Sequence, residues 1–380
     1  MNNLGRINDE FTAMWWPGLV VGLLSTAAFV WLGQTPVIRA LGLALAVIGV
    51  TMTLRRFGGA LAVIGGLALA FSPAFWSQTG GGAQPLATLI LVILGMAAAG
   101  TFLLWLIGRR PDLGLAAGMV LFVLLFWALT GTPRSLRLTT LLTAWMLYLL
   151  VDALMIANPR PEAGTSVQPG TRHTLGLLLL FTLGVLNDPL FILMAPALVL
   201  GLLMFRTRLP AWYWAALAVV LVVGVRGAAL VYLDSDWWLF PARQAVEQDI
   251  QVPFVMADGW REGSRWVYLI DIVVRQFTAA GALLGVVGLS RLSRWHPPVG
   301  EATMLAYAAY ALFGLMYFGK DSSVLLLPLL MIQVMWMTYA VYAFGQWLQK
   351  SRHPSRLHWL APAAFTLLPL TLLLRITGGG

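Results

Sequence analysis

Apolar stretches of about twenty residues recur along the chain, separated by short polar gaps. A helix needs about 20 apolar residues to cross 30 Å of hydrocarbon, and inside a bilayer it must satisfy its own backbone hydrogen bonds. The pattern therefore predicts an all-α, polytopic integral membrane helical bundle of about twelve or thirteen membrane segments. The single stretches are residues 14–33, 36–54, 59–76, 85–107, 113–131, 139–157, 211–233, 277–290, 302–318, 324–347 and 359–374.

One further apolar stretch, residues 174–205, is too long for an ordinary span. Asn187, Asp188 and Pro189 interrupt it where a helix should stop, because proline lacks the N–H that would continue the helix. We predict two short helices that meet at this break. If the stretch dips into the membrane and returns, the basic gaps on either side of it fall on one face.

Composition supports a membrane protein and narrows the chemistry. Hydrophobic residues make up 59% and charged residues 10% of the 380 positions, and the mean hydropathy is +0.82. A soluble domain has about a quarter of its residues charged. The absence of cysteine excludes disulfides, thiol nucleophiles and thiolate metal sites. The net charge of +9 comes from arginines in short loops, so it indicates topology and anionic lipid rather than nucleic acid.

Basic residues gather in alternate gaps, which predicts the orientation through the positive-inside rule. We expect these gaps to face the cytoplasm, in a bacterial cytoplasmic (inner) membrane. Arg134 and Arg137 fall on the opposite face and break the rule, either as tolerated charge or as an outer binding site for an anion. The cytoplasmic clusters are Arg55 with Arg56, Arg109 with Arg110, Arg160 with Arg172, Arg206 with Arg208, Arg291 with Arg294, and Lys350 with Arg352 and Arg356.

The chain divides into five regions. Residues 1–157 hold the amino-terminal membrane segments, 158–173 a cytoplasmic linker, 174–233 the broken helix pair and a span, 234–276 an extracytoplasmic amphipathic region, and 277–380 the carboxyl-terminal segments. In the amphipathic region charge alternates with large aromatics, as in helices that lie in the headgroup layer. Asp271 and Arg275 stand four residues apart there, and the simplest interpretation is a local ion pair.

Charged residues at membrane depth are few, so each is a candidate for function. Asp152 is expected near the cytoplasmic end of its span, where a carboxylate can reach water. Arg226 lies in the middle of a span and needs either a structural partner or a bound anion. All four histidines are expected in cytoplasmic loops without the spacing of a metal site.

Motif order supplies a family resemblance. A proline-started apolar segment from Trp15 to Gly33 precedes a span that ends in Leu54-Arg55-Arg56-Phe57-Gly58, and an Ala/Gly-rich span follows that ends in Phe71-Ser72-Pro73-Ala74-Phe75-Trp76. Later, residues 277–294 end in a basic loop, and Gly319-Lys320-Asp321-Ser322 leads into a Leu-Pro span. This order resembles the GT-C superfamily, the polytopic glycosyltransferases that use polyprenyl-phosphate sugars, and in particular its protein O-mannosyltransferase-like members.

The resemblance implies site residues. In that family a carboxylate in the first outer loop is the catalytic acid–base group, and Asp9 in Asn8-Asp9-Glu10 stands at about that place. The family has a span before this acid that is not seen before Asp9, which leaves open the side of the membrane and whether this is a degenerate member. Lipid-phosphate contacts would come from Arg134, Arg137 and Lys320, with further candidates at Asp188, Arg226, Asp234, Asp236 and Arg243.

Three functions stay open from the sequence. The first is a membrane glycosyltransferase-like protein that handles a lipid-linked sugar at the extracytoplasmic face, with polyprenyl-phosphate sugar and membrane lipids as partners. Its cofactor is unknown, and an active member could use a divalent cation; no metal ligands are assigned. The second is a non-catalytic integral membrane subunit of a larger complex on the same scaffold. The third is a transporter or lipid flippase, because broken helices often line substrate sites.

Overall fold

The structure is a computed structural model of the 380-residue chain. It describes residues 2–80, 136–159, 171–205, 209–233, 254–319, 321–351 and 360–378. The predicted spans 85–107 and 113–131 lie outside the described residues, as does most of the predicted linker. Statements about absent features below refer to the described ranges.

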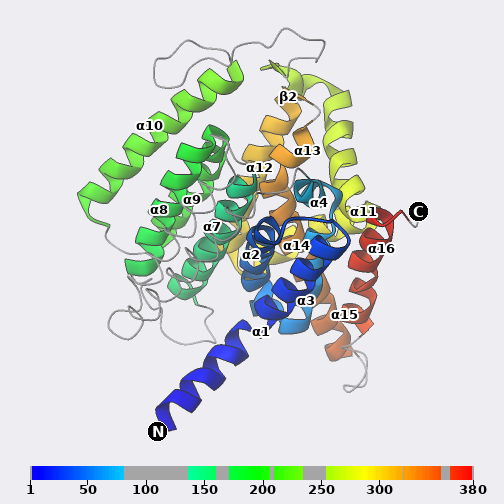
Figure 1. Ribbon diagram of the computed structural model, residues 1–380. Coiled ribbons are helices and arrows are strands. Elements are labelled where there is room, and N and C mark those ends of the chain that lie inside the picture. Colours follow the sequence, from blue (N-terminus) through cyan, green and yellow to red (C-terminus); the bar gives the residue numbers. More distant parts are fainter. Residues whose placement is uncertain are drawn as a thin grey trace.

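Helices make up nearly all of the described chain, and they pack side by side as a bundle (Figure 1). The first part contains α1 (Asn2–Trp31), α2 (Val37–Leu54), η1 (Arg55–Phe57), α3 (Gly59–Ala70), α4 (Pro73–Trp76), η2 (Ser77–Thr79) and α7 (Leu136–Ala157). The middle contains α8 (Thr171–Asn187), η4 (Pro189–Met194), α9 (Ala195–Met204), α10 (Ala211–Leu233), β1 (Phe254–Val255) and η5 (Gly259–Arg261). The last part contains α11 (Gly263–Trp295), α12 (Pro297–Met316), β2 (Tyr317–Phe318), α13 (Ser322–Leu325), α14 (Leu327–Ser351), α15 (Leu360–Phe365) and α16 (Leu367–Ile376).

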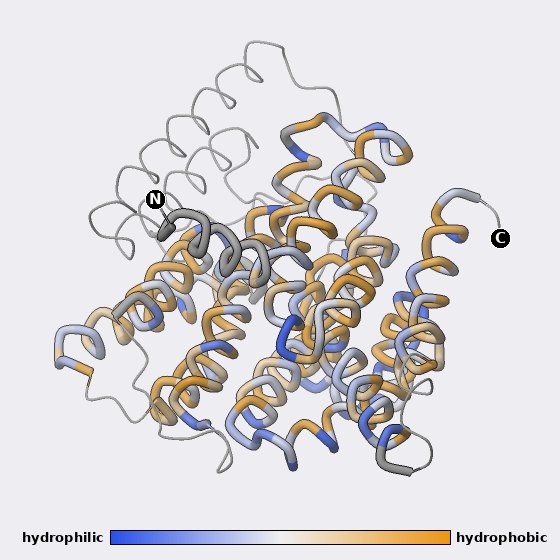
Figure 2. Tube along the Cα trace, turned by 90° about the horizontal axis from the view of Figure 1, so that it is seen from below, coloured by the Kyte–Doolittle hydropathy of each residue, from blue (hydrophilic) through white to orange (hydrophobic). Residues whose placement is uncertain are grey.

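The prediction of a helical membrane protein is confirmed. Seven helices of the described chain are long and apolar enough to cross a bilayer, or eight if one bent pair counts as a single span. Apolar positions dominate along the packed helices when the bundle is seen from below (Figure 2). The total of twelve or thirteen segments stays a prediction, because two of the predicted spans fall outside the described residues.

The bent pair is the predicted span 59–76. Helix α3 ends at Ala70, and the axis turns by 62° before the segment Pro73–Thr79. Proline disfavours the helical conformation of the residue before it, and Ser72 is accordingly extended, with φ −67° and ψ 138°. The bend directs residues 77–80 across the end of the bundle instead of out of it.

The predicted break in residues 174–205 is also confirmed. Helix α8 ends at Asn187, and α9 begins at Ala195 after the 3₁₀ turn η4. Both outer ends of this hairpin lie beside the last turns of α7. His173 contacts Asp152 on α7, and the Asn158 side chain donates to the Met204 carbonyl at 3.1 Å. The hairpin therefore enters the bundle and returns to the end where it began.

The helices define two ends of the bundle. We call one the basic end, because it carries Arg55 and Arg56 after α2, and Arg291 and Arg294 in the last turns of α11. We call the other the Asp188 end; it holds the tip of the α8–η4–α9 hairpin, the η2 turn and the start of α7 (Figure 1). The described basic clusters thus share one end, as predicted. Which side of a membrane this end faces stays a prediction.

Helix α11 differs from its prediction. The expected headgroup-layer helix and the expected span 277–290 form one helix of 33 residues, which is about 50 Å long and exceeds a 30 Å hydrocarbon core. Thr278 interrupts the helix with φ 66°, a region that β-branched residues rarely adopt, so α11 is kinked there. The pair β1–β2, with Phe254 opposite Phe318, joins the segment before α11 to the end of α12.

Burial ranks the helices from centre to periphery. The apolar window of α14 is 83% buried and lies at the centre of the described bundle. The window of α10 is only 28% buried, and it presents Val219, Val222 and Val225 on its exposed face. Apolar side chains that remain exposed on long spans are typical of a surface that meets lipid.

Candidate lipid-phosphate site

The tip of the α8–η4–α9 hairpin places a carboxylate inside the bundle. Because Pro189 follows it, Asp188 is extended, with φ −143° and ψ 113°. Its Oδ1 accepts a hydrogen bond from the Leu190 N–H at 3.1 Å, which caps the first turn of η4. The Asp188 side chain is 1% exposed. The local sequence thus both ends α8 and turns an acid towards the interior.

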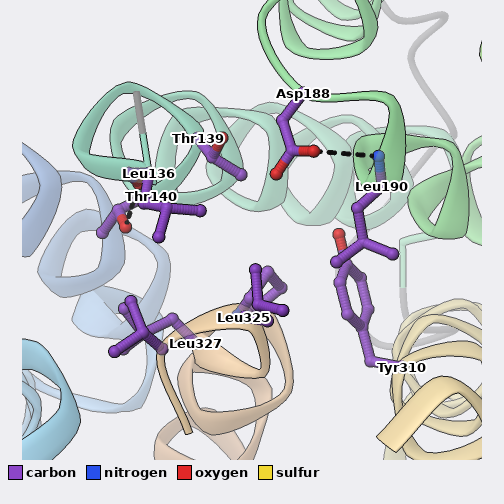
Figure 3. Close-up of a pocket in the computed structure, with 10 residues that line it drawn as sticks. Leu136, Thr139, Thr140, Asp188, Leu190, Tyr310, Leu325 and Leu327 are labelled. Carbon is purple, nitrogen blue, oxygen red and sulfur yellow. Dashed lines mark hydrogen bonds between the residues drawn. The ribbon is translucent and has the colours of Figure 1, made fainter. Parts of the chain in front are cut away.

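A small cavity of about 10 Å³ lies beside this carboxylate (Figure 3). This volume holds about one water molecule. In Figure 3 the Asp188 carboxylate lies between Thr139 on α7 and Tyr310 on α12. The lining residues are Leu136, Thr139, Thr140, Asp188, Leu190, Tyr310, Val324, Leu325, Leu327 and Pro328.

Hydroxyl and amide groups surround the cavity. The Asn187 side-chain amide donates to the Thr139 hydroxyl at 2.9 Å. The Tyr310 hydroxyl is buried and makes no hydrogen bond within the described chain. A buried hydroxyl without a hydrogen bond is costly, so this group is suited to bind a polar molecule that enters the cavity.

The next residue of α7 continues the polar contacts towards the η2 turn. The Gln78 side-chain amide donates to the Thr140 hydroxyl at 2.9 Å. The backbone carbonyl of Gln78 accepts from Arg137 Nε at 2.8 Å, and Arg137 Nη2 donates to the Gly80 carbonyl at 2.7 Å. Polar contacts therefore run along the first two turns of α7, from Arg137 to the hairpin tip.

A second arginine reaches the same turn from α2. Arg39 Nη1 donates to the Gly80 carbonyl at 2.8 Å and to the Thr79 carbonyl at 3.4 Å. Arg39 is buried, whereas Arg137 is half-buried. Two guanidinium groups thus share one carbonyl oxygen at the Asp188 end. Two positive charges held this close in a medium of low dielectric constant favour a bound anion.

The predicted site residues separate into groups. Arg137 and Asp188 are both at the Asp188 end and are linked by the contacts along α7. Arg226 is exposed near the middle of α10. The predicted residues Arg134, Asp234, Asp236, Arg243 and Lys320 lie outside the described residues.

Asp9 belongs to the first turns of α1, far from Arg137. Gly59, at the basic end, packs against the Trp16 ring, and Gly33, just after α1, lies near Thr79 at the Asp188 end. Asp9 and Trp31 are 22 positions apart in α1, which corresponds to about 33 Å of helix. The structure does not bring the predicted acid and the predicted phosphate contact together.

Sequence reasoning did not predict Arg39 as an anion contact. A signal was present, because Arg39 stands at the start of a span, on the same face as Arg134 and Arg137, and breaks the positive-inside pattern in the same way. The roles of Gln78 and Thr140 had no such signal, since they depend on how the η2 turn packs on α7.

A second buried carboxylate lies at the basic end. Asp152 of α7 is ion-paired with Arg56, Arg55 Nη2 lies 3.8 Å from its Oδ1, and His173 Nε2 lies 3.1 Å from its Oδ2. This corrects the expectation for His173, which is 3% exposed inside α8 and not in a loop. His296, also expected in a loop, caps α12 through Val299 N–H.

Arg265 is a second buried arginine beside Arg39, and its contacts are structural. It donates to the carbonyls of Gly314, Leu315 and Tyr317, which end α12. A guanidinium at a helix carboxyl terminus satisfies free carbonyls and the helix dipole. We therefore leave Arg265 out of the candidate site.

No cluster of three or more histidine or carboxylate side chains in the described part of the chain is arranged to hold a metal ion. No protein-family model, curated protein or solved structure matches this chain.

Proposed function

We propose that this membrane protein binds a polyprenyl-phosphate-linked sugar at the Asp188 end, with the lipid phosphate on Arg39 and Arg137, and that it has a GT-C-like scaffold. The observation that carries the proposal is the convergence of two guanidinium groups on the Gly80 carbonyl. Arginine is well suited to phosphate, because its planar fork donates two parallel hydrogen bonds. The motif order of the sequence supplies the class of lipid.

For the transfer step we propose Asp188 as the acid–base group, because it lies at the same end as Arg137. Its carboxylate would take the proton of an acceptor hydroxyl while that oxygen attacks the anomeric carbon. The bond between the anomeric carbon and the phosphate oxygen would break, and polyprenyl phosphate would leave with the electron pair. Arg39 and Arg137 would stabilise the departing phosphate charge. Access for a sugar requires the cavity to open, since it now holds about one water.

The first experiment measures binding. Protein in lipid nanodiscs is titrated with a radiolabelled undecaprenyl-phosphate hexose, for the parent and for Arg137→Gln, Arg137→Lys and Arg261→Gln. Loss of one charge-assisted pair is worth about 1.5–3 kcal/mol, so Arg137→Gln should bind about 10- to 100-fold more weakly. Arg137→Lys keeps the charge and should recover part of the affinity. Arg261, exposed at the same end, is the matched control and should bind as the parent does. Equal affinity in all four proteins would refute the phosphate site.

The second experiment measures turnover and tests which of two acids, Asp188 or Asp9, is catalytic. Asp188→Asn should lower sugar transfer or hydrolysis about 100-fold or more, because general acid–base groups contribute about 10²–10⁴-fold. Asp9→Asn should turn over as the parent does, since about 33 Å of helix separates Asp9 from the Arg137 end. The reverse result would return the catalytic role to Asp9 and would require α1 to lie differently in the membrane.

A non-catalytic subunit of a membrane complex is the second candidate, and two observations favour it. The cavity beside Asp188 admits about one water, and the acid at the family's usual place lies at the other end of the bundle. This candidate predicts binding without turnover, together with stoichiometric co-purification of membrane partners. A protein that is alone and monomeric in mild detergent, yet transfers sugar, would exclude it.

A further inference from the structure

Helices α11 and α14 cross at a stripe of glycines. A Cβ atom on Gly288 would lie 1.8 Å from the Trp336 carbonyl oxygen, and one on Gly285 would lie 1.9 Å from Gln333 Nε2. The Gln333 side chain also donates to the Gly281 carbonyl at 3.2 Å. Small residues at every fourth or third position allow two membrane helices to approach this closely. The crossing therefore fixes the position of α11 relative to α14, and both helices run from it towards the basic end.

Between this crossing and the basic end, the two helices leave a groove of about 270 Å³. Its walls are apolar apart from one arginine. Val287, Phe344 and Trp347 are each more than half exposed, so the groove is open along the outside of the bundle, where lipid would lie. The lining residues are Val287 and Arg291 of α11, and Ala340, Ala343, Phe344 and Trp347 of α14.

The basic end of the groove is positively charged. Arg291 and Arg294 are three residues apart on α11, both are exposed, and neither forms an ion pair with a described residue. On the facing helix the Trp347 ring stacks on Phe344, with ring centroids 5.6 Å apart. Tryptophan and arginine at the end of membrane helices are typical of the headgroup level. The groove thus runs from an apolar interior to a cationic mouth.

We propose that the α11–α14 groove binds one anionic phospholipid, with an acyl chain along the apolar walls and the phosphate on Arg291. Charge complementarity selects this occupant. An anionic lipid has an apolar chain joined to a negative headgroup, and the groove has apolar walls that lead to a positively charged mouth. Free phosphate shares the anionic chemistry but would leave the apolar walls empty. The site lies at the opposite end from Arg39 and Arg137, so its test is independent of the proposed function.

The test measures lipid retention. Delipidated protein in detergent is titrated with phosphatidylglycerol, and bound lipid is counted by native mass spectrometry for the parent, Arg291→Gln and Ala343→Trp. We expect one tightly bound lipid in the parent and at least 10-fold weaker binding in both variants. Arg291→Gln removes the phosphate contact, and Ala343→Trp fills the groove. Arg275→Gln and Ala308→Trp are the matched controls, since both positions are exposed elsewhere on the bundle, and they should retain the lipid.

Two further arms distinguish the source of the anion. Phosphatidylcholine should bind at least 10-fold more weakly than phosphatidylglycerol, and inorganic phosphate at millimolar concentration should not displace the lipid. Equal retention in the parent, Arg291→Gln and Ala343→Trp would overturn the proposal. Displacement by phosphate alone would also overturn it, because the acyl chain would then contribute nothing. Arg291 is exposed, so Arg291→Gln should fold even if the larger Ala343→Trp change does not.

Discussion

Two buried carboxylates, Asp152 and Asp188, lie at opposite ends of the helical bundle and have different neighbours. Asp152 contacts two arginines and a histidine from η1 and α8. Asp188 caps a 3₁₀ turn, and beside it are hydroxyl groups and a cavity of water size. An acid tied to several cations joins helices, whereas an acid beside a polar cavity can exchange partners. The comparison suggests stability as the main role at one end and ligand chemistry at the other.

The largest expected effect is at Asp152. Asp152→Asn removes the carboxylate that pairs with the exposed Arg56, the partly exposed Arg55 and the buried His173. Breaking a fully buried pair costs about 3–5 kcal/mol. Because the two arginines can reach water, we expect a smaller loss of about 2–3 kcal/mol. Unfolding by SDS in mixed micelles should show this loss. Asp271→Asn is the control, because its ion pair with Arg275 is exposed and should change stability by less than about 1 kcal/mol. If the two variants were equally stable, Asp152 would not have its main role in stabilising the fold.

A double-mutant cycle sharpens the same point. Asp152→Asn and Arg56→Gln should couple by about 0.5–1 kcal/mol, since Arg56 is exposed and the carboxylate also contacts Arg55 and His173. Additive losses would show that Arg56 does not depend on this carboxylate. The measurement is again the free energy of unfolding in mixed micelles.

A smaller effect is expected at Asp188. Asp188→Ala removes the cap of η4 and should cost about 1–2 kcal/mol, whereas Asp188→Asn keeps a capping oxygen and should cost less than about 1 kcal/mol. The comparison of interest is between stability and turnover, because Asp188→Asn should fold normally and lose transfer. If Asp188→Asn instead destabilised the protein as much as Asp152→Asn does, the distinction between the two acids would fail.

The smallest effect is expected at Tyr310. Its hydroxyl makes no hydrogen bond within the described chain, so Tyr310→Phe removes a buried polar atom at no cost in contacts. Stability should stay within about 1 kcal/mol of the parent, on the more stable side, by the same SDS titration. A loss above that value would mean that the hydroxyl is already bound to a group in the folded protein.

Local chemistry explains which features the sequence could predict. Helix α10 has the predicted bounds, and the hairpin breaks at Asn187 to Pro189, because span length and proline act through neighbouring residues. The candidate site was harder to predict from the sequence. Arg39 and Arg137 meet at Gly80 only because α2, the η2 turn and α7 pack together, and nearly a hundred residues separate the two arginines. His173 reaches Asp152 for a similar reason.

The position of α1 also depends on packing that no local pattern encodes. Gly18 and Gly22 lie against Met52 and Ile48, so α1 runs along α2 across the bundle. A helix that lay along the membrane surface could have the same composition. The end of the bundle at which Asp9 lies therefore follows from helix packing and not from hydropathy.

The hairpin tip has a consequence for the order in which the protein is made. Synthesis runs from the amino terminus, so Asp188 emerges about 120 residues before Tyr310 and the α13–α14 residues that close its cavity. Until those helices arrive, the polar tip has no complete cover against hydrocarbon, where exposed polar groups are costly. The hairpin can contact α7 as soon as it is made, because Asn187 donates to Thr139, but its cavity closes only after the carboxyl-terminal third of the chain has been inserted.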